Sequence, residues 1–100
     1  MYTLELNEHF LRKYAKLVKK NQGLEAQVQK ILLQLQEDPR QPSLRCHKVG
    51  SVVFGNVSTC KVTGDIRILW NYSKHSERTL IIYDIGGHSG GRKVYSVLFG

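Results

Sequence analysis

The sequence has few cysteines and no long apolar run. Its two cysteines, Cys46 and Cys60, show no CxxC spacing and make no disulfide framework of the kind found in small secreted domains. This scarcity favours a reduced, cytoplasmic setting. The apolar runs are far shorter than the ~20 residues that a membrane-crossing helix needs, and the first residues lack a signal-peptide pattern. These absences predict a soluble cytoplasmic protein without a membrane partner.

Acidic residues are also scarce. The chain holds 15 Lys and Arg residues against eight Asp and Glu, a net charge of +7. Residues 1–38 have six basic and five acidic residues, a balance of +1, whereas residues 39–100 have nine and three, a balance of +6. A positive field concentrated in one half of the chain favours a nucleic acid or an acidic protein as the partner.

The first part of the chain has the pattern of a short strand and two helices. The length of 100 residues predicts one domain over residues 1–100. Residues 2–6 alternate apolar and polar, and Asn7 is a good N-cap for an amphipathic helix that ends near Lys20. A second amphipathic helix begins at Leu24 and stops before Pro39. Because the turn between them is short, the helices are predicted to form an antiparallel hairpin whose apolar face covers a sheet.

The second part of the chain has the pattern of a sheet. Polar turns at residues 63–65 and 73–78 separate short β-branched runs, and the run over residues 79–85 is apolar on both faces, which is typical of a central strand. The predicted strands cover residues 52–54, 57–63, 66–72, 79–85 and, at an edge, 93–98. Consecutive strands with short turns predict a twisted, mainly antiparallel sheet. The fold class is therefore α+β.

Titratable and cationic side chains lie at the ends of these strands. Cleavage of RNA without a metal requires proton transfer to and from oxygens and cations that stabilise a pentacoordinate phosphate. His47 and His88 titrate near neutral pH, and Asp65 could orient a histidine or act as a base. Arg67, predicted to point away from the apolar face of its strand, could stabilise the transition state. The further candidates for binding RNA phosphates are Arg45, Lys48, Lys61 and Arg92, and Tyr95 could stack on a base or contact a phosphate.

Simpler interpretations of the same residues exist. A histidine after a strand is commonly an ordinary surface residue, and Arg67 beside Asp65 could form only a surface ion pair. The possible zinc ligands Cys46, His47, Cys60, His75 and His88 do not have the spacing of a zinc module. The glycine-rich stretch over residues 86–91 lacks the lysine and the following helix of a Walker loop. We therefore predict neither a metal nor a cofactor.

The order of these motifs resembles the RelE/ParE toxin superfamily, and within it the RelE/YafQ-type mRNA interferases. The resemblance covers nearly the whole chain and is carried by three short motifs and one aromatic residue. These are His47-Lys48-Val49, Asp65-Ile66-Arg67-Ile68, Ile85-Gly86-Gly87-His88 and Tyr95. By position, His47, Asp65 and His88 match acid–base residues of YafQ-like members, and Lys61 falls where some members have another histidine.

The resemblance implies a RelE-like fold and a definite function. The implied protein is the toxin of a type II toxin–antitoxin pair, an endoribonuclease that cuts mRNA in the ribosomal A site and is silenced by an acidic antitoxin. Two alternatives share the fold: a ParE-like inhibitor of DNA gyrase without nuclease activity, and a toxin-fold corepressor that acts only with its antitoxin on DNA. Fold alone does not decide among them.

Overall fold

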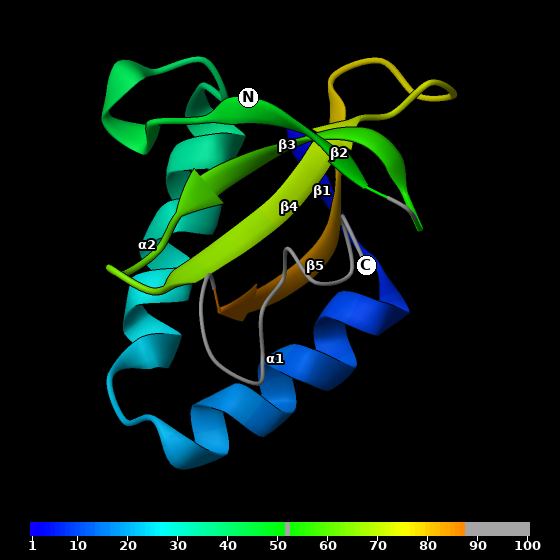
Figure 1. Cartoon of the computed structure of the whole chain (residues 1–100). Coiled ribbons are helices and arrows are strands. Elements are labelled where there is room, and N and C mark those ends of the chain that lie inside the picture. The colour runs from blue at the N-terminus through cyan, green and yellow to red at the C-terminus, as the bar shows by residue number, and fades with distance from the viewer. Residues whose placement is uncertain (52, 88–100) are drawn as a thin grey trace.

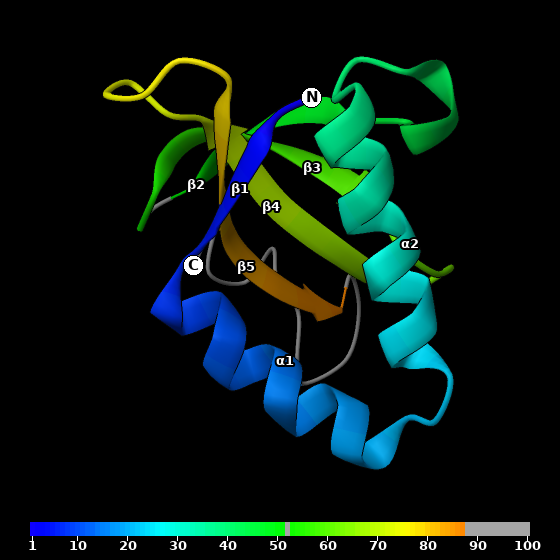
Figure 2. The ribbon, with the colours of Figure 1, turned by 180° about the vertical axis from the view of Figure 1, so that it is seen from behind.

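The computed structural model describes residues 1–51 and 53–87, which form one sheet with two helices on one side (Figures 1 and 2). The strands lie in the order β1-β5-β4-β3-β2. Their bounds are β1 Thr3–Leu6, β2 His47–Ser51, β3 Gly55–Lys61, β4 Ile66–Tyr72 and β5 Thr79–Gly87. The helices are α1 Glu8–Lys20 and α2 Leu24–Glu37, with the short 3₁₀ helix η1 at Pro42–Leu44. The predicted α+β class is confirmed.

The two helices begin and end where the sequence indicates. The side chain of Asn7 accepts a hydrogen bond of 2.7 Å from the backbone N–H of His9, which satisfies one of the unpaired donors at the start of α1. Gly23 has a φ of +88°, a left-handed conformation that suits glycine, and α2 starts at the next residue. The helices meet at this turn and then splay apart into an open V (Figure 2). None of the helices in the described part of the chain has the length and apolar character to cross a membrane.

The sheet is mixed, with one parallel pair at an edge. β1 runs parallel to β5, whereas the neighbours β5 and β4, β4 and β3, and β3 and β2 are antiparallel. β5 therefore lies between two strands, which agrees with its apolar character on both faces. A register shift between Leu69 and Trp70 leaves Tyr83 as an extra residue in β5, because Leu69 pairs with Asp84 and Trp70 with Ile82. Such a bulge changes the direction of the side chains around it.

One predicted strand is wrong in its position. Residues 53 and 54 lie in the turn between β2 and β3, and β2 occupies the preceding residues instead. The backbone N–H of Phe54 donates to Ser51 Oγ at 2.9 Å, and Gly55 has a φ of +80°, so local hydrogen bonding and a glycine set this turn. Val52, the other residue of that prediction, and the predicted edge strand over residues 93–98 lie outside the described residues.

Hydrophobic residues pack on both faces of the sheet. The larger core lies between the sheet and the helices, and we call that side the helix face. Phe10, Leu24, Val28 and Leu35 of the helices are at most 1% exposed there. The strands contribute Cys60, Ile66, Ile68, Trp70, Leu80, Ile82 and Ile85 to this core. A smaller cluster on the second face contains Val49, Phe54, Val57, Leu69 and Tyr83.

Candidate active site

Three of the predicted site residues share the second face of the sheet. Lys61 is the last residue of β3 and lies directly opposite Arg67 of β4. His47, the first residue of β2, pairs with Thr59, two residues before Lys61. Directly opposed side chains on one face have Cβ atoms ~4.5–5.5 Å apart, and diagonal neighbours ~7–8 Å. The register therefore gathers an imidazole, an ammonium and a guanidinium from three successive strands.

A turn holds Arg67 in place. The Arg67 Nη1 atom donates a hydrogen bond of 3.1 Å to the carbonyl oxygen of Thr63, in the turn that precedes β4. The hydroxyl of Thr63 in return accepts from the backbone N–H groups of Asp65 and Ile66, at 3.2 and 3.0 Å. Asp65 is exposed in this same turn. Thr63 thus links two of the candidate site residues, Asp65 and Arg67, at this end of β4.

The remaining described candidates are distributed differently. Lys48 pairs with Ser58, which pairs with Trp70, so alternation along the strand places Lys48 on the helix side of the sheet. Arg45 has a φ of +51° and ends η1, with its N–H donating to the carbonyl of Pro42 at 3.0 Å. The side chains of His47 and Lys48 therefore leave opposite faces of the edge strand β2.

Arg45 lies between two hollows in the surface. The first is bounded by α2, η1 and the end of β3, and its lining includes Lys30, Arg45 and Lys61. The second, beside the start of β2, is lined by Arg40, Arg45, His47 and Lys48 together with Trp70 and Tyr72. Burial and, to a lesser degree, the neighbouring Tyr2 raise the pKa of Tyr72, which favours the neutral phenol. Both hollows thus carry positive charge near the predicted site.

Three predicted residues, His88, Arg92 and Tyr95, lie outside the described residues. The last two described residues are Gly86 and Gly87 of β5, which pair with Arg67 and Ile66. Among the described residues, no group of three His, Cys, Asp or Glu side chains comes together as metal ligands would.

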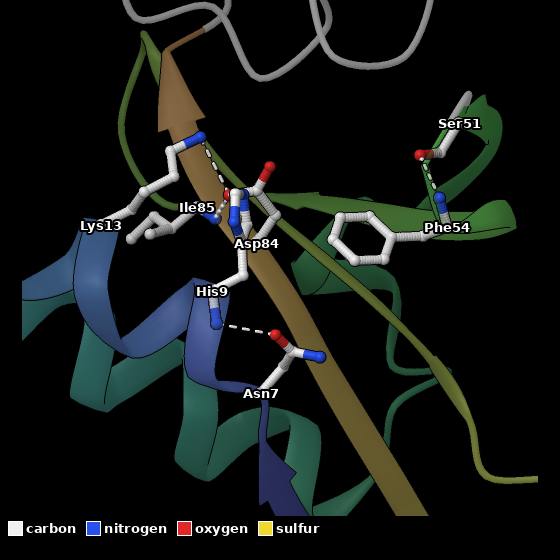
Figure 3. Close-up of polar contacts among 7 residues, drawn as sticks. All are labelled: Asn7, His9, Lys13, Ser51, Phe54, Asp84 and Ile85. Carbon is white, nitrogen blue, oxygen red and sulfur yellow. Dashed lines mark hydrogen bonds and ion pairs between the residues drawn. The ribbon is translucent and has the colours of Figure 1, made fainter.

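Sequence reasoning missed a buried ionic cluster between α1 and β5 (Figure 3). Asp84 is 0% exposed, and its Oδ1 atom lies 2.9 Å from Lys13 Nζ and 3.3 Å from His9 Nε2. The same oxygen accepts from the backbone N–H of Ile85 at 2.8 Å. A carboxylate that is buried away from solvent requires such partners, because an unpaired buried charge strongly destabilises the fold. The cluster therefore fastens α1 to β5.

Aromatic rings extend this cluster along the second face. The ring of His9 packs edge-on against the ring of Phe54, with ring centroids 5.7 Å apart. The ring centroids of Phe54 and Tyr83 are 4.9 Å apart. A signal for the cluster was present in the sequence, because an aspartate inside the apolar run of residues 80–87 is rarely buried without a partner. His9 and Lys13 are four residues apart and so share a side of α1. Nothing in the sequence, however, says which strand that side meets.

The fold was compared with known structures. YafQ from E. coli superposes with a TM-score of 0.68 at 17% identity, and the match covers the whole of both chains. The fold is that of RelE/YafQ-type toxins. A metal-bound toxin from Helicobacter pylori matches with a TM-score of 0.69 and 25% identity over 88% of this chain and 96% of that one. A chain of the E. coli DinJ-YafQ complex also matches, at 18% identity with a TM-score of 0.67 over the whole of both chains.

Comparisons of sequence alone find no such match: no protein-family model and no curated protein matches the chain. The RelE/YafQ-type fold, predicted from a few short motifs, is thus confirmed by the backbone. At these identities a shared fold does not transfer a function, which depends on the residues of the site.

Proposed function

We propose that this chain is the toxin of a type II toxin–antitoxin pair and an endoribonuclease that cleaves mRNA. The observation that carries the proposal is the triad of His47, Lys61 and Arg67 on the second face of a RelE/YafQ-type sheet. A surface for binding alone needs cations, but an imidazole beside them adds a group that can move a proton near neutral pH.

In the proposed reaction, the ribose 2′-oxygen loses its proton, attacks the adjacent phosphorus, and the 5′-oxygen leaves with a proton. His47, Asp65 and His88 are the proposed acid–base groups. Arg67 and Lys61 stabilise the charge that builds on the phosphate oxygens, because guanidinium and ammonium groups aimed at a developing charge favour the transition state. Because the hydrogen bond to Thr63 already holds the Arg67 guanidinium in place, its side chain needs little rearrangement when negative charge builds on the phosphate.

The remaining cations would hold the RNA strand. Arg45 shares one hollow with Lys61 and another with Lys48, so a phosphate chain could follow it from one to the other. Arg92 and Tyr95 complete the proposal, as a further phosphate ligand and as an aromatic contact to a base or a phosphate.

The proposal includes partners and a setting. The positive balance of residues 39–100 suits an acidic antitoxin as well as RNA, and a YafQ chain of the same fold has been solved in complex with DinJ. The proposed substrate is mRNA in the A site of the ribosome, and the proposed compartment is the cytoplasm.

An RNA cleavage assay tests this proposal. His47→Gln is expected to lower the cleavage rate ~10²–10⁴-fold, and Arg67→Met ~10²–10³-fold. The matched controls are His75→Gln and Lys74→Met, because both residues are exposed in the loop beyond the other end of β4. The controls should cleave as the unaltered chain does, and products should carry a 2′,3′-cyclic phosphate and a 5′-hydroxyl.

The result that overturns the proposal is full cleavage by His47→Gln, Arg67→Met and His88→Gln, each with an unchanged melting temperature. Cleavage of ribosome-bound but not free mRNA would establish the ribosomal setting. If the chain cleaves neither form and instead blocks gyrase supercoiling, the ParE-like alternative replaces this one.

A further inference from the structure

The two cysteines lie opposite one another across neighbouring strands. His47 of β2 pairs with Thr59 of β3 in antiparallel register, so the preceding residue, Cys46, faces the following one, Cys60. Both side chains belong to the core on the helix face, where Cys60 is 1% exposed and Cys46 is half-buried. Both are free thiols. Directly opposed residues of antiparallel strands have Cα atoms ~4.5–5.5 Å apart, within the 4.4–6.8 Å that a disulfide spans.

The two thiols differ in their surroundings. A hydrogen bond from Cys60 lowers the pKa of Cys46, and the neighbouring Trp70 acts in the same direction against the effect of burial. The same contact with Cys46, together with burial, strongly raises the pKa of Cys60. Cys46 also lines the surface hollow that contains Arg45 and Lys48, so a small reagent can reach it. Cys46 is thus the nucleophile of the pair and Cys60 the protonated, buried partner.

We propose that Cys46 and Cys60 form a peroxide-responsive pair that closes to a disulfide between β2 and β3. In the first step the Cys46 thiolate attacks one oxygen of hydrogen peroxide. An S–O bond forms, the O–O bond breaks, and hydroxide leaves and takes up a proton. In the second step the Cys60 sulfur attacks the sulfenic sulfur, and the S–O bond breaks as hydroxide leaves with the Cys60 proton. Two thiols and one peroxide become a disulfide and two waters.

The bond would alter the surface above it. Cys46 precedes His47 and Cys60 precedes Lys61, so the disulfide would lie directly beneath two residues of the candidate site. It would also join the residue just before the edge strand β2 to the neighbouring strand β3 and close a short loop. The pairing itself stands on register and burial and does not depend on the proposed ribonuclease activity.

Mass spectrometry of the full chain tests the pair. The protein is treated with equimolar hydrogen peroxide, denatured, and labelled with N-ethylmaleimide. We expect a monomer lighter by two hydrogens that takes no label, a peptide linked through Cys46 and Cys60, and full labelling after dithiothreitol. From the length of the closed loop, the melting temperature should rise by roughly 12–24 °C. Formation of intermolecular dimers, or oxidation of Cys46 to sulfinic acid while Cys60 remains free, overturns the proposal.

Two variants test the order of the steps. Cys60→Ala should stop at the sulfenic acid, so that dimedone labels Cys46, and Cys46→Ser should leave Cys60 unoxidised by the same peroxide. Because Cys60 is in the core, circular dichroism must first show that Cys60→Ala is folded. If Cys60→Ala is not folded, the proposal is tested by the Cys46–Cys60 linked peptide of the unaltered chain and by the oxidation state of Cys60 in Cys46→Ser. Rapid oxidation of Cys60 in Cys46→Ser would refute the assigned roles.

Discussion

Replacing Lys13 by methionine should destabilise the fold far more than a change at an ordinary helix lysine. Its ammonium lies 2.9 Å from Asp84 Oδ1, and the carboxylate is completely buried. Methionine keeps most of the aliphatic volume, so the change removes the charge while the packing is nearly retained. Among the described residues, the carboxylate then keeps His9 and the N–H of Ile85 as partners.

The size of the effect follows from the environment of the pair. Removing one member of a buried ion pair costs ~3–5 kcal/mol, because the other charge remains without water and without its partner. The side chain of Lys13 is 27% exposed, and His9 can still compensate in part, so we expect about 3 kcal/mol. For a domain of this size each kcal/mol shifts the melting temperature by ~4–8 °C, which gives a loss of roughly 12–24 °C.

Thermal and urea unfolding measure this loss. Arg12→Met is the matched control, since Arg12 is on the same helix but forms an exposed ion pair. Its Nη1 atom lies 4.0 Å from Glu8 Oε1, and the two side chains are 68% and 84% exposed. Such a pair contributes ~0–1 kcal/mol. Asp84→Asn combined with Lys13→Met should be less destabilised than the sum of the single changes, with a coupling of ~1–3 kcal/mol. If Lys13→Met is no more harmful than Arg12→Met, the buried pair does not hold α1 to the sheet.

Three further measurements address the fold and the thiol. Leu35→Ala, at a position with no exposure, should cost ~2–5 kcal/mol in urea unfolding, whereas Leu33→Ala on the exposed side of α2 should change stability by less than ~1 kcal/mol. Asn7→Ala removes the cap of α1 and should cost ~1 kcal/mol, and an unchanged stability would mean that the cap bond contributes nothing. Alkylation of Cys46 by iodoacetamide should reach half its maximal rate at a lower pH than for a free cysteine, because its pKa is lowered; a midpoint at or above the ordinary thiol pKa would contradict this.

Local chemistry made the helices and most strands predictable. Asn7, Gly23 and Pro39 mark helix ends whatever the rest of the chain does, and α1 and α2 follow them closely. Alternation in residues 66–72 likewise predicted that Arg67 would leave the apolar face, as the cores on the two faces confirm. The strand predicted at residues 52–54 was wrong, because β-branched composition does not distinguish a strand from a turn closed by Ser51 and Gly55.

The candidate site was likewise predictable in part from the sequence. Its residue types were readable from the sequence, since histidines and cations at strand ends are a feature of the chain itself. Three features of the site depend on contacts between segments far apart in the chain. Lys61 lies opposite Arg67, the side chain of Lys48 points to the helix face, and Asp84 contacts Lys13. A shift of one residue in register would reverse every one of these side chains.

By itself the sequence determined where both helices begin and end, which of their faces are apolar, and that the second part of the chain is strongly basic. These properties depend on neighbours a few residues apart, because caps, turns and periodicity are local. Only the tertiary structure decided that β1 joins β5 in parallel, that Cys46 faces Cys60, and that a buried aspartate receives two side chains from α1. Those contacts form when distant segments bury a common core, and their register is set by the packing of that core as a whole.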